Sequence, residues 1–271
     1  MGTRAEALRS AGKSVALVAT MGAMHAGQRA VIAAAKAAGQ APVVAIFTNP
    51  LQLGSNESPA PYLARRADDL LACAAAGADT VFTPSVDEVF PRSSGTFVTE
   101  ETISKKLCGI SRPNHFRGIT TFSAYLFNVI RPHTVYFGQK NIQRAAVVRR
   151  MAEELKFPVE IVVVPTVRET DGLAAGVENA SMTPNQRRSA VALNQALDKI
   201  KAMVEAGATS PDRLIAEATH ILAQHRQVRV IYISVVDRVT MDAVRDVTPG
   251  RCLAVIAVWV DELRLIDNVL L

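Results

Sequence analysis

Short apolar runs alternate with longer alanine-rich segments through the first part of the chain, and this alternation constrains the fold most. The runs read VALVA (15–19), PVVAIF (42–47), TVFTP (80–84), TVYFG (134–138) and VEIVVVP (159–165). Near-continuous apolar runs of this length are typical of strands buried on both faces of a parallel sheet. The segments between them, QRAVIAAAKAAG, RADDLLACAAAG and NIQRAAVVRRMAEEL, space apolar residues as helices do, and the first two end in glycine. The pattern predicts an α/β fold with a Rossmann-like doubly wound parallel sheet.

The sequence changes character after about residue 167. A charged, turn-rich stretch, RETDGLAAGVENASMTPNQ, precedes two long helical segments at 184–206 and 211–226. Three strand-like runs follow, VRVIYISVV, CLAVIAVWV and LRLIDNVLL. We therefore expect a Rossmann-like domain that binds nucleotide and acid over 1–167, and a smaller C-terminal α+β lid domain over 168–271.

Composition excludes several classes of protein. With 49% hydrophobic and 20% charged residues and no apolar run near 18 residues, a membrane-spanning chain is not expected, and the N-terminus lacks the apolar core of a signal peptide. The three cysteines, Cys73, Cys108 and Cys252, are too far apart for a structural zinc site or a disulfide framework. The net charge of +5 is scattered and only 5% of residues are aromatic, so nucleic acid is not an expected partner. These features favour a cytoplasmic enzyme acting on small acidic molecules.

Polar residues follow three of the predicted strands. TMGAMHAGQ follows the first, TNPLQLGSNES the second, and GQKNIQR the strand at 134–138. In an open parallel sheet, ligands bind beyond the carboxyl ends of the strands, and glycine turns before a helix suit a phosphate. The three segments therefore predict one phosphate-binding cleft.

These motifs resemble a known family. ATMGAMHAGQ, FTNPLQLGSNE, GADTVFTPSVDEVFP, LCGISRPNHFRG, YFGQKNIQ, VPTVRETDGLA and LRLIDNVLL together resemble the pantothenate synthetases (pantoate–β-alanine ligases), of the HIGH-motif nucleotidyl-transferase superfamily. The resemblance implies an ATP-dependent ligase that forms an acyl adenylate from a small acid and passes the acyl group to an amine. It also implies Mg²⁺ bound with ATP through phosphate oxygens, no protein metal site, and a homodimer.

The resemblance assigns roles to residues of this chain. It implies catalytic roles on the ATP phosphates for His25 and Lys140. The implied substrate-binding residues are Met21, Asn49, Gln52, Arg112, His115, Gln143 and Arg144. The implied nucleotide-binding residues are Gly22, Gly27, Gln28, Gly138, Asn141, Val167 and Glu178.

Several of these positions depart from the family pattern. The family signature His-x-Gly-His ends here in Gln28, and Asn141 replaces an aspartate that faces ribose. A loop that reads Ser-Ser-Arg-Asn in the family and closes over the triphosphate is Gly-Val-Glu-Asn at 176–179. Reversing a charge about 4 Å from a phosphate changes the interaction by several kcal/mol at an effective dielectric of roughly 20. Gln143 and Arg144 stand where the family has two consecutive glutamines, one of which grips pantoate, and the guanidinium of Arg144 suits a carboxylate or phosphate.

Three functions remain open on these grounds. The first is the amide-forming ligase; the second is a diverged paralogue that makes little adenylate and uses another acid, another amine or a pre-activated acyl donor. The third is a non-catalytic ligand-binding protein. We interpret the remaining candidates as structural: the histidines His133, His220 and His225, the thiol of Cys108, the packing residue Tyr125, and the pair Asp68–Asp69 at the positive end of a helix dipole.

Overall fold

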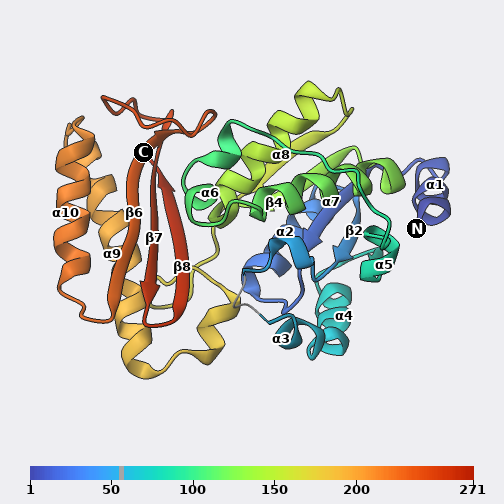
Figure 1. Cartoon of the computed structure of the whole chain (residues 1–271), viewed down its shortest axis with the longest axis horizontal. Coiled ribbons are helices and arrows are strands. Elements are labelled where there is room, and N and C mark those ends of the chain that lie inside the picture. The colour runs from blue at the N-terminus through green and yellow to red at the C-terminus, as the bar shows by residue number, and fades with distance from the viewer. Residues whose placement is uncertain (55–57) are drawn as a thin grey trace. The chain divides into compact units, whose positions relative to one another are not determined.

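The chain forms two compact units, Met1–Pro165 (unit 1) and Thr166–Leu271 (unit 2). A computed structural model describes residues 1–54 and 58–271, so Ser55–Glu57 of the predicted TNPLQLGSNES segment lie outside the described residues. Figure 1 shows the helices and strands of both units, and each unit is described by itself.

Unit 1 is built on a five-stranded parallel sheet with the order β3-β2-β1-β4-β5. The strands are β1 (Val15–Thr20), β2 (Ala41–Ile46), β3 (Thr80–Phe82), β4 (Thr134–Gly138) and β5 (Glu160–Val164). All five coincide with the predicted runs to within a residue or two, and the doubly wound α/β fold is confirmed. The strand order reverses between β1 and β4, and ligands of such sheets bind at this switch point.

Helices connect the strands of unit 1. The α-helices are α1 (Gly2–Ser10), α2 (Ala26–Ala37), α3 (Ala60–Leu63), α4 (Arg66–Ala75), α5 (Val86–Val89), α6 (Cys108–Ser111), α7 (His115–Ile130) and α8 (Ile142–Glu154). The 3₁₀ turns are η1 (Pro50–Gln52), η2 (Ile103–Lys105) and η3 (Gln139–Asn141). Gly39 and Gly77 follow α2 and α4 with φ of +74° and +93°, the left-handed conformation expected of glycines that end helices.

The core of unit 1 lies between the sheet and its helices. Every residue of β2 is buried. Ile32 of α2 and Cys73 of α4 pack against the central strands in one hydrophobic cluster. The apolar runs of β1, β2 and β4 therefore form the interior of the sheet, whereas the edge strands β3 and β5 are only partly buried.

Helix α7 was not predicted from the sequence. It buries ten of its sixteen residues, and the buried set includes Gly118, Thr120 and Ser123. Small and polar residues therefore interrupt a buried face that is otherwise apolar. β-Branched and aromatic residues, which are modest helix formers, make up much of the rest.

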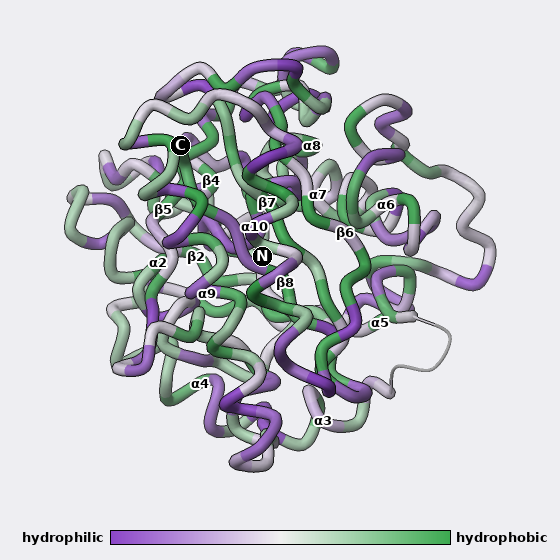
Figure 2. The backbone as a smooth tube through the Cα atoms, turned by 90° about the vertical axis from the view of Figure 1, so that its left-hand side faces the viewer, coloured by the Kyte–Doolittle hydropathy of each residue, from purple (hydrophilic) through white to green (hydrophobic). Residues whose placement is uncertain are grey.

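Unit 2 is a smaller α+β unit, as expected. Its antiparallel sheet has the order β6-β7-β8, and its elements are η4 (Val177–Ser181), α9 (Pro184–Glu205), α10 (Pro211–Ala223), β6 (Val228–Asp237), β7 (Cys252–Val260) and β8 (Leu263–Leu270). The two helices lie side by side along the sheet (Figure 1). The central strand β7 is hydrophobic along its length, as its green tube in Figure 2 shows, and is buried at all but one position. Leu193, Leu197 and Leu214 of the helices pack into the same core.

Two features are absent from the described part of the chain. No helix within it is long and apolar enough to cross a membrane. No group of three or more His, Cys, Asp or Glu side chains among the described residues is arranged to hold a metal ion.

Candidate functional site

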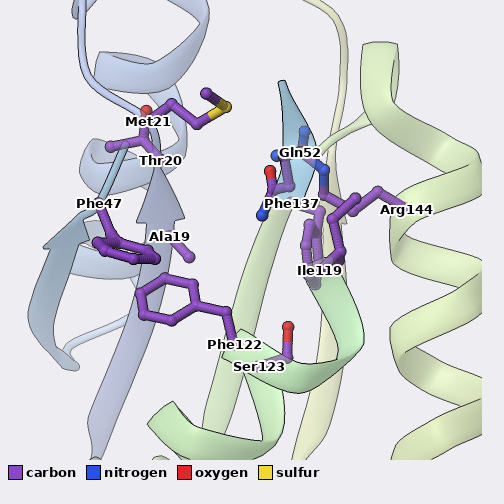
Figure 3. A pocket seen from close by; sticks show the side chains of 10 residues that line it. All are labelled: Ala19, Thr20, Met21, Phe47, Gln52, Ile119, Phe122, Ser123, Phe137 and Arg144. Carbon is purple, nitrogen blue, oxygen red and sulfur yellow. The ribbon is translucent and has the colours of Figure 1, made fainter. Parts of the chain in front are cut away.

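A small pocket opens at the switch point of the unit 1 sheet. The residues that line it come from the ends of β1 and β4, the residue after β2, and η1, α7 and α8: Ala19, Thr20, Met21, Phe47, Gln52, Ile119, Phe122, Ser123, Phe137 and Arg144. One wall is apolar, with the rings of Phe47 and Phe122 4.6 Å apart between centroids. Figure 3 shows the Arg144 side chain reaching from α8 toward Gln52, across the pocket from Thr20 and Met21. The pocket thus combines an apolar wall with a cationic side.

The turn between β1 and α2 is held by side chains at almost every residue. The Thr48 hydroxyl donates to the carbonyl of Met21 (3.1 Å), and the Gly22 N–H donates to the Thr20 hydroxyl (3.2 Å). Gln28 donates from Nε2 to the Thr20 hydroxyl and to the Gly22 carbonyl (3.4 Å). A turn fixed in this way has the same conformation before and after a ligand arrives, which favours binding.

Asp69 of α4 contributes most to this turn. Its carboxylate accepts from the N–H of Ala23 (2.8 Å) and from the N–H of Met24 (2.7 Å), and the residue is 2% exposed. The same carboxylate explains why residue 22 is a glycine. Gly22 has φ of +110°, and the Cβ of any other residue there would lie 2.8 Å from Asp69 Oδ2. The expected place of Asp69 at a helix dipole is confirmed, since it lies in the first turn of α4. The sequence gives no sign of its contact with Met24, which is 45 residues away.

His25 and Gln28 begin helix α2 together. The Gly27 N–H donates to His25 Nδ1 (3.2 Å), and Gln28 Oε1 accepts from the His25 N–H (2.9 Å), which forms a capping box. In a capping box each side chain satisfies a backbone N–H that the first helical turn leaves without a partner. Gln28 therefore has a structural role at this end of α2, where the helix dipole attracts anions.

The residues after β4 lie at the other side of the switch point. Gly138 ends β4, Lys140 lies in η3, and Asn141 is the N-cap residue of α8, although its side chain makes no capping hydrogen bond. Gly138 has φ of −76°, a conformation open to any residue. Because β1 and β4 are neighbours in the sheet, Lys140 and the β1–α2 turn follow the carboxyl ends of adjacent strands.

Asn49 and Gln52 differ in what they face. Asn49 is fully buried; it donates to the carbonyl of Gly118 in α7 (3.0 Å) and accepts from the Leu51 N–H (3.1 Å). Gln52 lines the pocket. Its backbone carbonyl accepts from the guanidinium of Arg112 (2.9 Å) and lies 3.0 Å from His115 Nδ1. Asn49, Arg112 and His115 thus hold the η1 backbone that presents Gln52, and direct substrate contacts by these three residues stay predictions.

Gln143 and Arg144 are adjacent, yet of the two only Arg144 lines the pocket. Gln143 accepts from the Cys108 N–H (3.1 Å) and donates to the carbonyls of Ile103 (3.0 Å) and Lys106 (2.6 Å). Its amide therefore fastens the segment 103–108 to α8. A substrate contact by Gln143 also stays a prediction.

Arg144 is a partly buried cation that lines the pocket. Its Nε is inaccessible and has no hydrogen-bond partner in the described part of the chain. Burial, and then the charge of Arg112, lower the pKa of Arg144 to about 10. The group therefore stays positive at pH 7, in surroundings that disfavour its charge.

The comparisons with known proteins identify the family. The profile of the pantoate-beta-alanine ligase family matches residues 1–270. The chain belongs to this family. The pantothenate synthetase of Moorella thermoacetica is 41% identical over 265 residues, covering 98% of this chain and 93% of the relative, and that of Acidobacterium capsulatum is 42% identical over 259 residues, covering 96% and 86%.

Solved structures of pantothenate synthetases have the same fold. A crystal structure of the Thermus thermophilus enzyme matches with a TM-score of 0.88 and 35% identity, covering 98% of this chain and 96% of that chain. The pantoate-beta-alanine ligase of Francisella tularensis matches with a TM-score of 0.74 and 23% identity over 99% and 95% of the two chains. The chain is thus a pantothenate-synthetase-like member of a family of carbon–nitrogen ligases.

The two remaining predicted residues of the pantoate–β-alanine ligase site, Val167 and Glu178, belong to unit 2. The Val167 carbonyl accepts from the Ala175 N–H (2.9 Å), and Glu178 lies in η4. Beside it, Asn179 donates to Glu169 Oε1 (2.6 Å) and to the carbonyl of Ala174 (3.1 Å). The family's asparagine therefore fastens this segment within unit 2, whereas the nucleotide contacts of Val167 and Glu178 stay predictions.

Cys73 lies on α4, the helix that carries Asp69, and its thiol is not reactive at pH 7. Cys73 is fully buried in α4, and burial, with a smaller effect of the Asp69 charge, raises the pKa of its thiol to about 11. The thiolate is the nucleophilic form, so Cys73 is unreactive at pH 7.

Proposed function

We propose that this protein is an ATP-dependent ligase that joins a small carboxylic acid, pantoate or a relative, to an amine, β-alanine or a relative, through an acyl adenylate. The observation that carries the proposal is the pocket at the β1/β4 switch point, bordered by a fixed turn before the N-terminus of α2. Such a turn suits phosphate, and an adjoining pocket with apolar and cationic sides suits a small acid.

The relatives support the same reaction class. The curated relatives are named pantothenate synthetases, and the Francisella tularensis structure was solved in complex with beta-gamma ATP and β-alanine. Family membership of this chain extends over nearly its whole length.

The proposed mechanism is mainly one of positioning and charge neutralisation. ATP phosphates would bind between the positive end of the α2 dipole, His25 and Lys140. The acid in the pocket would attack the α-phosphate through a carboxylate oxygen, forming the acyl–AMP bond as pyrophosphate leaves. The amine nitrogen would then attack the acyl carbon, lose a proton and release AMP. Mg²⁺ would be held through phosphate oxygens and would neutralise part of their charge.

A second candidate function is a diverged paralogue with slow or absent adenylation that uses a different acid, amine or pre-activated acyl donor. In its favour are three departures from the family pattern that the resemblance implies: Gln28 for a histidine, Glu178 for an arginine and Arg144 for a glutamine. In the structure the Gln28 side chain is engaged in the capping box, and Arg144 lines the pocket.

Single-turnover release of pyrophosphate, with excess protein over Mg-ATP and saturating pantoate, tests these candidates. Fast release supports the ordinary ligase. Slow release that rises when Gln28→His is combined with Gly176→Ser, Val177→Ser and Glu178→Arg supports the diverged paralogue. Failure to release pyrophosphate with every acid, together with binding of ATP or acid, would support a non-catalytic ligand-binding protein.

We further propose, from the family resemblance, that the protein acts as a homodimer in the cytoplasm. Sedimentation equilibrium gives the mass of the particle in solution, and a monomer at micromolar concentration would contradict the dimer.

A further inference from the structure

We propose that the acid substrate carries a second anionic group, and that Arg144 binds this group while the reacting carboxylate lies toward the β1–α2 turn. The inference rests on the proposed function. It narrows the acid from any small carboxylic acid to a short acid with a second carboxylate or a phosphate.

The first argument is the state of Arg144 itself. Its Nε is buried and has no hydrogen-bond partner within residues 1–54 and 58–271, and the residue lines the pocket. Among the described residues, the groups that act most strongly on its charge are Arg112, Cys108 and Tyr62, and none of these three is a carboxylate. A buried guanidinium is stable when an anion accepts its hydrogen bonds, and its planar fork suits carboxylate and phosphate equally.

The second argument is the course of the reaction. When a carboxylate becomes an acyl adenylate, its own negative charge is lost. If Arg144 bound the reacting carboxylate, this step would leave the guanidinium buried again without a counter-charge, which opposes the step. An anionic group elsewhere on the acid keeps its charge through both half-reactions, so its pair with Arg144 is undisturbed.

The third argument is the arrangement of the pocket. Arg144 and Gln52 lie together on the side away from Thr20 and Met21, which end β1 and begin the turn (Figure 3). An acid held by Arg144 at one end therefore directs its other end toward that turn. The facing rings of Phe47 and Phe122 suit a short carbon chain between the two ends.

The test compares acids that differ only in the second anion. Pyrophosphate release from Mg-ATP is measured without amine for 3-phosphoglycerate against glycerate, and for malate against lactate, with pantoate as the family reference. We expect the dianionic acid of at least one pair to have a kcat/KM about tenfold or more above its monoanionic partner. The two pairs distinguish a phosphate from a second carboxylate.

Three variants assign the preference to Arg144. Arg144→Gln should abolish the preference, and Arg144→Lys should retain part of it because the charge remains. Arg150→Gln, on the same helix and paired with Glu154 at 3.6 Å, is the matched control and should leave the preference unchanged. An equal or greater kcat/KM for the monoanionic acids, or a preference that survives Arg144→Gln in a folded protein, would overturn the inference.

A binding measurement separates this inference from the proposed function. The same four acids are titrated calorimetrically into the protein without ATP. If no acid releases pyrophosphate, the ligase proposal fails, yet tighter binding of the dianionic acids to the native protein than to Arg144→Gln still supports the inference. Equal binding to both proteins would overturn it.

Discussion

Asp69 offers the sharpest test of how the fold prepares the nucleotide site. Asp69→Asn keeps the size of the side chain but removes its charge and replaces one acceptor oxygen with an NH₂ group. In the native protein the two carboxylate oxygens accept from Ala23 and Met24 at 2.8 and 2.7 Å, at a residue that is 2% exposed. The variant keeps at most one of these hydrogen bonds, because its NH₂ group is a donor and faces the other backbone N–H, which is also a donor.

The magnitude follows from these contacts. A hydrogen bond to a charged group contributes about 1.5–3 kcal/mol, and a buried donor left without an acceptor adds to the loss. We therefore expect the turn to be destabilised by about 2–3 kcal/mol. If most of this cost falls on the conformation that binds phosphate, pyrophosphate release slows by about 30–150-fold, because each 1.4 kcal/mol corresponds to a factor of ten.

The assay is single-turnover pyrophosphate release over a range of Mg-ATP concentrations, with thermal unfolding measured in parallel. Asp68→Asn is the matched control, since Asp68 is exposed on the same helix and loses the same charge. A rate within about twofold of the native rate in folded Asp69→Asn would refute the reasoning, and an equal loss in both variants would show a general charge effect.

Three further predictions concern other residues. His25→Ala and Lys140→Ala should each slow adenylation by about tenfold or more, measured as pyrophosphate release; full activity in both would remove their catalytic assignment. Gln28→His with Glu178→Arg should speed pantoate adenylation, and an unchanged single-turnover rate would count against the diverged paralogue. Glu100→Gln should lower the free energy of unfolding by about 1–2 kcal/mol at pH 7, because the buried carboxylate accepts from the amides of residues 102–104. Burial raises the pKa of Glu100, but these hydrogen bonds together lower it by more, so the net shift is downward. The difference in free energy of unfolding between Glu100→Gln and the native protein should be largest above about pH 4.3. It should shrink as the pH falls through the lowered pKa, and urea unfolding at several pH values would measure it.

The strands of the parallel sheet were predictable because each is an unbroken run of apolar residues. Such a run is costly to expose to water, so it is expected inside a sheet. Helix α7 was not, since its buried face includes Gly118, Thr120 and Ser123 beside several β-branched and aromatic residues. Its helical state depends on packing against neighbours distant in the sequence, which outweighs local propensity.

In the candidate site, too, local features were predictable and contacts between distant residues were not. The turn after β1 was recognisable from its glycines and histidine, because such turns have a local chemical signature. The role of Asp69 was not recognisable, since the side chain that fixes the turn lies on another helix. Gln143 and Arg144 were assigned one role from their shared position, but the helix directs Gln143 to the segment 103–108 and Arg144 to the pocket.

The contact between α7 and η1 makes the shape of the pocket depend on a residue that does not line it. A Cβ at Gly118 would lie 2.7 Å from the Cβ of Leu51 and 3.1 Å from its backbone carbon, so any larger residue there must push η1 away from the helix. Gln52 ends η1 and would move with it, because the 3₁₀ turn is a single short unit. The absence of a side chain at position 118 thus sets the spacing between α7 and η1. A substitution there would reshape the pocket without changing any residue that lines it.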